Sequence, residues 1–540
     1  MSMPRYPVAA RNGLVVSPNY HATIAGVRVL QEGGNAVDAA LATNAVLGVV
    51  EPQMCGLGGD LFMLIYAPAD GKLHALNAAG RTPYAVNREW FAGRGLTQNP
   101  FRGPFSVSVP GVVDGWVAAN QRFGSRPLST LLQPAIAYAS EGWALRRHTQ
   151  KHIRQSEANL RQYPAAAKNY LPGGALPQPG QVLRNPELAK ALQAVAAQGR
   201  DAVYGGGPVG EAILATLNEG GWPMSQRDLD DTHCDWVEPI STDYRGHTVY
   251  EFPPSNQGLA PLIMLNILEG YDLAASGFGT AETIHLQVEA KRRAFLLRDL
   301  HCADPAFYQA PVAELLSKEF AATLRASIDP TKVTDAGAVQ PPMAGGSTAG
   351  DTIYLNVVDK AGMCVSLIQS NYSDWGSGVM VSDMGFFLHN RGCAFQLDPA
   401  HPNTYEPHRR PFHTLIPAMA FKDGKPWLIF GTRGADGQAQ TQVQLLCNIV
   451  DFGMNPQEAQ DAPRWRGNST YQAPSPDPLL MEGRFPDSVM AALTARGHAV
   501  EVGEDYADEM GHASVIQIDQ TEGVFLGAYD PRSDGAAIGW

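Results

Sequence analysis

The sequence has few cysteines and no long apolar run. Its six cysteines are scattered with no C-x-x-C pair, which predicts buried, reduced thiols (Cys55, Cys234, Cys302, Cys364, Cys393 and Cys447). No stretch reaches the ~20 apolar residues of a membrane span, and the N-terminal MSMPRYPVAARNG lacks the apolar segment of a signal peptide. We therefore expect a cytoplasmic protein without a membrane partner.

Positive charge is also scarce. Lys and Arg number 40 against 53 Asp and Glu, which gives a net charge of −13 and a pI near 5.5. Because no basic stripe offers a footprint for phosphates, nucleic acid is not expected as a partner. The 540 residues, 44% of them hydrophobic, allow two to four domains or one large layered domain, and we favour the latter.

Common cofactor and hydrolase motifs are missing. The sequence contains no H-E-x-x-H and no G-x-x-x-x-G-K-[ST], and GGSTAG fails as G-x-S-x-G because Ala349 replaces the second glycine. The fragment CGLGGD at 55–60 lacks dinucleotide-loop spacing and favours a tight turn where backbone approaches backbone. The histidines, among them His389, His401, His408 and His413, show no metal-ligand spacing. We expect neither cofactor nor metal.

Periodicity predicts an α+β protein. GLVVS at 13–17 favours a strand, His21–Glu32 a helix ending at a glycine pair, and Asn35 the cap of a second helix through Val50. The region from about 128 to 328 is mostly helical in pattern, with a strand pair around 246–253.

From 329 to 350 the composition becomes that of a flexible linker, and strands follow it. TIYLNVV at 352–358 and CVSLIQS at 364–370 predict a hairpin. Further strands are predicted at GVMVS, GFFLHN, WLIFG, SVIQI and VFLGA. Mixed strands with helices on both sides favour two packed sheets between helical layers.

Thr352 stands where the linker meets the first of these strands. A threonine hydroxyl is a poor nucleophile unless a base accepts its proton, and the α-amine of an N-terminal threonine is one such base. A cut between Asp351 and Thr352 would create that group. The local pattern alone is weak, because a threonine that begins a strand after a loop is common.

Eight motifs resemble the γ-glutamyltranspeptidase family, in the same order and over nearly the whole chain. They are GGNAVDAALA (33–42), EPQMCGLGGD (51–60), SVPGVVDGW (108–116), FPPSNQG (252–258), the run from GDTIYLNVV to FFLHNRG (350–392), RRPFHTLIPAM (409–419), GTRGADGQAQTQ (431–442) and DPRSDG (530–535). Together the motifs identify the chain as a member of this family by resemblance.

The resemblance implies an N-terminal nucleophile hydrolase with a four-layer αββα sandwich. One precursor would be cut between Asp351 and Thr352 into a large chain, 1–351, and a small chain, 352–540, which together form one domain and stay associated. Thr352 would attack an amide carbonyl and form an acyl-enzyme. Gly434, with Ala435 beside it, stands where the family's glycine pair donates N–H groups to the oxyanion. Ser370 stands where a family threonine hydrogen-bonds the nucleophile.

The substrate-binding positions depart from those of the members that bind a γ-glutamyl group. The family's carboxylate-binding arginine falls on Ala79, with Arg81 two residues later on a shifted backbone, and its ammonium-binding aspartate falls on Ala394. The site has therefore lost the carboxylate that would pair with an ammonium. Arg81 either reaches in for the missing arginine or is structural.

Four other positions change the character of the pocket. The family's serine pair falls on His413 and Thr414, its asparagine falls on Tyr372, and Arg391 stands where that branch has a neutral amide. Because arginine binds carboxylates through two hydrogen bonds, a substrate with a carboxylate and no α-amine fits better than glutathione. Arg391 as a structural ion pair and His413 as a packed ring remain alternatives.

Three readings follow. The first is an amidohydrolase of the oxamate type, acting on a small carboxylate amide. The second is a glutathione hydrolase or γ-glutamyl transferase, with acylases of longer dicarboxylic amides between the two. The third, an inactive binding or structural protein, leaves the joint presence of Thr352, Ser370 and Gly434 unexplained. The expected partners are a small-molecule amide substrate and the second chain of the precursor, and homo-oligomer formation stays open.

Overall fold

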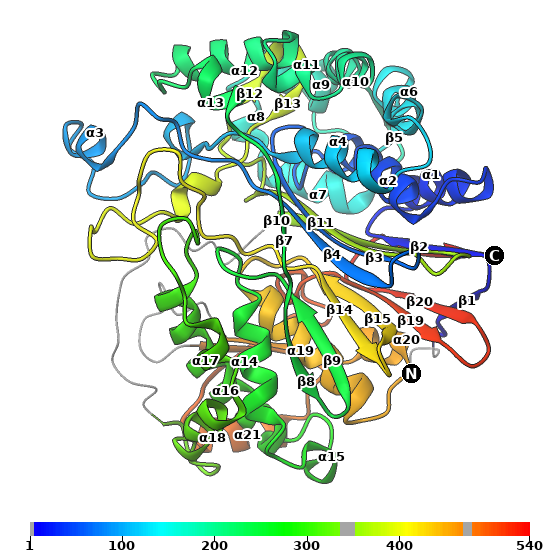
Figure 1. The fold of residues 1–540 in the computed structure, drawn as a ribbon, viewed down its shortest axis with the longest axis vertical. Helices are drawn as coiled ribbons and strands as arrows, with labels where there is room; N and C mark the ends of the chain where they lie inside the picture. Colours follow the sequence, from blue (N-terminus) through cyan, green and yellow to red (C-terminus); the bar gives the residue numbers. More distant parts are fainter. Residues whose placement is uncertain (1–4, 335–350, 468–477) are drawn as a thin grey trace.

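A computed structural model describes residues 5–334, 351–467 and 478–540, and in it two seven-stranded sheets lie face to face (Figure 1). The first sheet runs in the order β21 (Ala536–Gly539), β2 (Gly13–Ser17), β10 (Asp351–Asp359), β11 (Cys364–Tyr372), β3 (Asp60–Ala67), β4 (Lys72–Ala78) and β7 (Asp235–Val237). The second runs in the order β1 (Val8–Ala10), β20 (Val524–Tyr529), β19 (Ala513–Asp519), β15 (Lys425–Thr432), β14 (Ala418–Lys422), β9 (His247–Glu251) and β8 (Ile240–Tyr244).

Helices cover the outer face of each sheet (Figure 1). The first sheet is covered by α1 (Tyr20–Gln31), α2 (Ala36–Val50) and α4 (Val112–Phe123), and the second by α14 (Leu259–Leu268), α19 (Gly437–Val450) and α20 (Pro456–Asp461), with α16 (Ala281–His301) packed on α14. The predicted four-layer αββα sandwich of the α+β class is confirmed.

Further helices and three small sheets lie outside the two main sheets. The remaining described helices are α3 (Arg88–Ala92), α5 (Leu128–Leu131), α6 (Gln133–Glu141), α7 (Arg147–Gln155), α8 (Glu157–Leu160), α9 (Pro164–Tyr170), α10 (Pro186–Gln198), α11 (Asp201–Tyr204), α12 (Pro208–Glu219), α13 (Gln226–Asp230), α15 (Leu273–Ser276), α17 (Val312–Leu315), α18 (Lys318–Ala326) and α21 (Asp487–Ala495). Small sheets join β5 (Trp143–Ala144) to β6 (Val182–Leu183), β12 (Met380–Val381) to β13 (Phe386–Phe387), and β16 (Trp465–Gly467), β17 (Pro478–Glu482) and β18 (Ala499–Gly503) to one another.

Strand β10 is central to the first sheet, between β2 and β11. Its side chains alternate, as the twofold period of a strand requires: Ile353, Leu355 and Val357 pack toward α2, whereas Tyr354 and Val358 belong to the core that contains the second sheet. The pairing with β11 shifts register between Asp351 and Ile353, so the strand is irregular where Thr352 stands.

Both sheets take strands from either side of residue 351. In the first sheet, β2, β3, β4 and β7 come from before it and β10, β11 and β21 from it onward; the second sheet is divided likewise. Every inter-strand pair that joins the two parts, such as β10 with β2, would hold them together after a cut. Because the two parts share both sheets, we expect them to stay together as one domain after a cut.

The first predicted elements agree closely with the structure. The 13–17 strand is β2, the two N-terminal helices are α1 and α2, and Asn35 caps α2 in a capping box with Asp38. The 352–370 hairpin is β10 and β11, and the strand pair near 246 is β8 and β9. Of the expected linker, residues 335–350 lie outside the described residues.

Two expected strands are shorter than predicted. GVMVS and GFFLHN contain only the two-residue strands β12 and β13. Gly378 and Gly385 adopt positive φ angles of 76° and 69°, a backbone that interrupts a strand.

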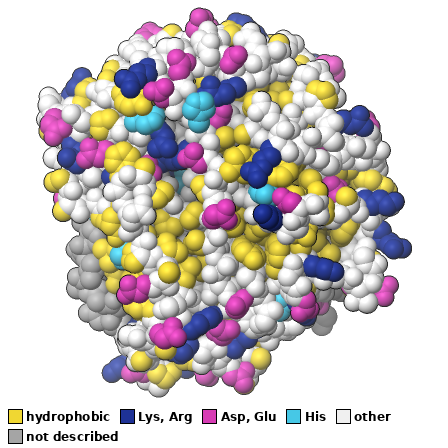
Figure 2. Space-filling view, in the orientation of Figure 1, with side chains coloured by type: hydrophobic (Ala, Val, Ile, Leu, Met, Phe, Trp, Pro, Cys, Tyr) yellow, Lys and Arg dark blue, Asp and Glu magenta, His cyan; other side chains and the backbone are white. Residues whose placement is uncertain are grey.

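All six cysteines are free. Among the described helices, none combines the length and apolar character needed to cross a bilayer. On the face drawn in Figure 2, Lys and Arg are interspersed with Asp and Glu, in keeping with the absence of a basic stripe from the sequence.

Candidate active site

The structure brings Thr352 and Ser370 together across the β10–β11 hairpin. The Thr352 hydroxyl donates a 3.0 Å hydrogen bond to the Ser370 hydroxyl, and the Tyr372 amide donates to the same oxygen at 2.7 Å. Both hydroxyl-bearing residues are 2% exposed, so their geometry is fixed by packing. The hairpin thus presents a buried hydroxyl with a defined partner at the start of a central strand.

Gly434 and Ala435 form a turn between β15 and α19. Their φ angles are 132° and 47°, and the left-handed backbone explains a glycine at the first position. The Gly434 carbonyl accepts from Gly437 and the Ala435 carbonyl from Gln438, while neither of their own amides donates a hydrogen bond within the described residues. Two adjacent unpaired N–H groups at such a turn suit an anion or an oxyanion.

Arg391 is buried close to the hairpin, with 1% of its surface exposed. Its guanidinium carbon lies 3.7 Å from the centre of the Tyr372 ring, and one Nη donates to the Thr414 hydroxyl at 3.1 Å. Nε and the other Nη have no hydrogen-bond partner among the described residues. Burial lowers the pKa of Arg391 from its ordinary value and outweighs the opposing effect of Asp60 and Asp436, and no carboxylate of the described residues forms an ion pair with it.

His413 faces Asp60, the first residue of β3. Its Nε2 lies 3.2 Å from the Asp60 carboxylate, and His389 lies 3.6 Å from the same oxygen. Burial, followed by the nearby charge of Arg391, lowers the pKa of His413 to about 3, so its ring is neutral at pH 7. His413 is therefore a neutral, packed ring beside Arg391, with its Nε2 facing the Asp60 carboxylate.

Asp60 also belongs to the candidate site, although nothing in the sequence singled it out. It pairs across the sheet with Ser370, and its other oxygen accepts from the Gly80 and Gly111 amides. Burial raises its pKa, but the facing histidines and these hydrogen bonds outweigh burial and lower it overall. The only signal in the sequence was its place at the end of EPQMCGLGGD.

The glycines of that motif behave as predicted. A Cβ on Gly58 would stand 2.1 Å from the Phe387 carbonyl, and one on Gly59 would stand 2.5 Å from the Ser370 carbonyl. The tight turn therefore lets the backbone before β3 approach the backbone of the candidate site.

Arg81 is placed differently from the other candidate substrate-binding residues. It lies 3.4 Å from Asp304 and 3.7 Å from Asp235, and no hydrogen bond or ion pair joins it to Thr352 or Arg391 within the described chain. Ala79 and Ala394 are buried, and as alanines they offer no charge to a substrate. The contacts of Arg81 therefore favour a structural role for it over substrate binding.

A second group beside Thr352 was invisible in the sequence. His148, Asp508 and His512 place ligand atoms within 4.8 Å of one another, and come from segments more than 350 residues apart. Asp508 and His512 are only four residues apart, but His148 lies 360 residues before Asp508, so no spacing rule links it to them. The Arg433 guanidinium contacts Asp508 and lies 2.9 Å from His512, so a cation already stands among the three.

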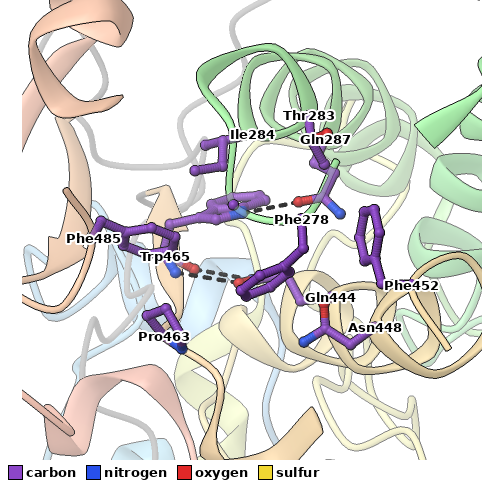
Figure 3. Close-up of a pocket in the computed structure, with 11 residues that line it drawn as sticks. Phe278, Thr283, Ile284, Gln287, Gln444, Asn448, Phe452, Pro463, Trp465 and Phe485 are labelled. Atoms are coloured by element: carbon purple, nitrogen blue, oxygen red, sulfur yellow. Dashed lines mark hydrogen bonds between the residues drawn. The ribbon is translucent and has the colours of Figure 1, made fainter. Parts of the chain in front are cut away.

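A different cavity lies between α16, α19 and the small sheet (Figure 3). Apolar and polar side chains both line it. The Trp465 indole donates to Gln287 at 3.1 Å, and the Trp465 backbone exchanges hydrogen bonds with Gln444. These polar groups satisfy one another. None of the candidate catalytic residues Thr352, Ser370, Gly434 and Ala435 lines this cavity.

Known proteins resemble this chain over nearly its full length. The family model described as Gamma-glutamyltranspeptidase matches residues 22–540. The glutathione hydrolase-like YwrD proenzyme of Bacillus subtilis is 41% identical over 97% of this chain and 98% of its own length, and the oxamate amidohydrolase proenzyme of Klebsiella pneumoniae is 38% identical over 98% of each. The crystal structure of cephalosporin acylase from Bacillus halodurans superposes with a TM-score of 0.91 at 35% identity, over 100% of this chain and 98% of that one.

Proposed function

We propose, because this chain belongs to the γ-glutamyltranspeptidase family, that it is a self-processing amide hydrolase with Thr352 as nucleophile. The observation that carries the proposal is the buried Thr352–Ser370 hydrogen bond at the start of a central strand. A cut between Asp351 and Thr352 gives Thr352 a free α-amine, which accepts the hydroxyl proton as the oxygen attacks the substrate carbonyl. The similar proteins named as proenzymes support a precursor of this kind.

The acyl-enzyme forms with the developing oxyanion directed at the amides of Gly434 and Ala435. Those N–H groups have no other acceptor within the described residues, so they need not break a bond to bind the oxyanion. The amine of Thr352 then returns its proton to the leaving nitrogen, and water releases the acyl group. Apart from the substrate and water, every reacting group in these steps comes from the chain, so the proposed steps need no cofactor.

The substrate we propose is a small carboxylate amide such as oxamate, hydrolysed to oxalate and ammonia. Arg391 supports this, because it is a buried guanidinium that has two unpaired donor nitrogens and no ion pair with a carboxylate in the described part of the chain, which suits it to a carboxylate ligand. Tyr372 and Thr414 hold its orientation from two sides. Ala394 supplies no partner for an α-ammonium, which disfavours a γ-glutamyl substrate.

The alternative is a glutathione hydrolase, a γ-glutamyl transferase or an acylase of longer dicarboxylic amides. The similarity to the YwrD proenzyme and to cephalosporin acylase supports this alternative. Arg81 lends the γ-glutamyl alternative little support, since it is already paired with Asp304.

A hydrolysis screen of the purified, matured protein tests the proposal. Oxamate, glutathione, glutaryl amides and γ-glutamyl anilide are compared at equal concentration, with ammonia or amine release as the readout. The highest kcat/KM for oxamate is expected. A preference for glutathione or for γ-glutamyl anilide would overturn the substrate, and inactivity of the matured protein on every amide would overturn the function.

A further inference from the structure

The motif FPPSNQG at 252–258 lies beside the segment that carries His413 and Thr414, and the proposed mechanism makes no use of this contact. The His413 amide donates to the Ser255 carbonyl, and the Gln257 amide donates to the His413 carbonyl, each at 3.0 Å. Backbone hydrogen bonds in both directions hold the two segments side by side. The motif is therefore fastened to two of the candidate substrate-binding residues.

The side chain of Gln257 extends this connection to the candidate oxyanion turn. It is fully buried, and its Nε2 donates to the Thr414 carbonyl at 2.8 Å and to the Ala435 carbonyl at 3.0 Å. A glutamine amide carries two N–H groups on one nitrogen, so it can serve both acceptors at once. One buried nitrogen therefore joins two backbone segments that are distant in the sequence.

Arg298, on α16, fixes the direction in which the Gln257 amide points. Its Nη1 donates to Gln257 Oε1 at 2.8 Å and to the Asp436 carboxylate at 2.9 Å, and the arginine is fully buried. Because a guanidinium only donates and a carbonyl only accepts, the amide oxygen must face Arg298 and the amide nitrogen must face the two carbonyls. Asp436 follows Ala435 in the chain, so the same arginine also holds the end of the turn.

The two carbonyls that Gln257 holds belong to the two halves of the proposed substrate site. The Thr414 hydroxyl accepts from Arg391 at 3.1 Å, so the position of Thr414 affects the group proposed to bind the substrate carboxylate. Ala435 lies in the turn whose amides are proposed to bind the oxyanion. A substrate reacts only if the distance from its carboxylate to its scissile carbonyl matches the distance between these halves.

We propose that Gln257 is a positioning residue that sets the spacing between Arg391 and the Gly434–Ala435 turn, and so restricts the enzyme to amides whose carboxylate lies at one fixed distance from the scissile carbonyl. In oxamate the carboxylate carbon is bonded directly to the amide carbon, whereas malonamate and succinamate have one and two methylene groups between them. A fixed spacing suits one member of this series and places the carbonyl of the others away from the turn. The inference rests on the proposed function, since it needs both halves of the site to engage one substrate.

The experiment compares kcat/KM for oxamate, malonamate and succinamate in the matured parent enzyme, with ammonia release as the readout. We expect the value for oxamate to exceed that for succinamate by at least about tenfold, because a misplaced carbonyl forfeits the hydrogen bonds to its oxyanion. A parent enzyme that does not prefer oxamate in this way overturns the inference without any variant.

Two substitutions of similar size test Gln257 itself. Gln257→Glu keeps an acceptor for Arg298 but turns a carboxylate oxygen toward the two carbonyls, and Gln257→Met removes every hydrogen bond of the side chain. In both variants kcat/KM for oxamate should fall by at least about tenfold while that for succinamate falls by less, so the preference narrows. A general loss of stability would lower the values for all three acids in parallel. A parallel fall, or an unchanged preference, overturns the inference.

Gln444→Glu is the matched control. Gln444 is also buried, its Nε2 donates to the carbonyls of Gln440 at 3.1 Å and Trp465 at 3.0 Å, and its Oε1 accepts from the Trp465 amide at 3.2 Å. It lines the cavity of Figure 3, away from the candidate catalytic residues. This variant loses hydrogen bonds of the same kind and should keep the ratio of oxamate to succinamate. An equal narrowing in the control would show that the effect is not particular to Gln257 and would overturn the inference.

The two hypotheses fail in different ways. Absence of a Thr352 N-terminus in active protein overturns the proposed function itself. A matured parent enzyme that prefers oxamate, with the preference intact in both Gln257 variants, overturns only the role of Gln257. If one of the two variants does not mature, the other variant and the preference of the parent decide the outcome.

Discussion

The guanidinium carbon of Arg391 lies 3.7 Å from the ring centre of Tyr372, and the amide of the same tyrosine donates to the hydroxyl of Ser370 at 2.7 Å. Ser370 in turn accepts the hydrogen bond of Thr352. One residue therefore links the candidate carboxylate-binding group to the candidate nucleophile. Tyr372 has a φ angle of 76°, so its position depends on a backbone that the surrounding packing must hold.

Maturation is the first testable consequence. We expect active protein to consist of two associated pieces, residues 1–351 and 352–540, because Thr352 needs a free α-amine to act as its own base. Thr352→Ala should remain one chain, Thr352→Ser should be cut slowly, and Thr216→Ala on α12 should mature normally. Intact mass and N-terminal sequencing decide it, and a fully active uncut chain ends the hypothesis.

Arg391→Ala should lower kcat/KM for oxamate by about tenfold to a hundredfold or more, because losing a charge-assisted hydrogen bond costs roughly 1.5–3 kcal/mol. Self-cleavage should be spared, since that step handles no free carboxylate. Arg227→Ala, at an exposed arginine, is the control. If Arg391→Ala hydrolyses oxamate as well as the parent enzyme does, Arg391 does not bind the substrate carboxylate, and the γ-glutamyl alternative is favoured.

Ser370→Ala should lower kcat by about tenfold, because it removes the acceptor that holds the Thr352 hydroxyl and leaves the Tyr372 amide without that partner. Ser370→Thr should retain most activity, since it keeps a hydroxyl at the same place. Steady-state kinetics of the two matured variants make the comparison. Equal activity of the alanine and threonine variants would show that the hydroxyl is dispensable.

Acidification should destabilise the protein partly through His413. Its pKa is about 3 in the folded chain and about 6.5 in an unfolded one, so between these values the unfolded chain binds a proton that the folded chain does not. Stability is therefore lost as the pH falls below about 6.5, by up to roughly 1.4 kcal/mol per pH unit. His413→Gln should show a smaller fall in Tm between pH 7 and pH 5, and an identical fall would contradict the assignment.

Chelation should leave hydrolysis unchanged. The group of His148, Asp508 and His512 has ligand atoms at metal-binding separation, but the guanidinium of Arg433 already contacts two of its members. We expect the matured enzyme to keep its kcat after treatment with EDTA and desalting. Loss of activity that Zn²⁺ or Mn²⁺ restores would show that a metal displaces Arg433.

The sequence by itself determined the layered fold and the candidate nucleophile. Periodicity located β2, α2 and the β10–β11 hairpin, because hydrophobic alternation and an Asn35 cap act within one element. The position of Thr352 followed from the order of motifs along the chain, which the sequence records directly. Strand length in the segment from 378 to 390 was overestimated, because glycines with positive φ interrupt it.

Only the tertiary structure decided which side chains meet. Arg391 and Arg81 are both arginines near family motifs. Arg391 lies over Tyr372 with two donor nitrogens that have no partner among the described residues, whereas Arg81 pairs with Asp304. Likewise, the sequence separates His148 from Asp508 by hundreds of residues, and packing brings them to one cavity beside Thr352. Contacts of this kind arise where distant segments close on one another, so their charge states follow from burial and neighbours that no local pattern encodes.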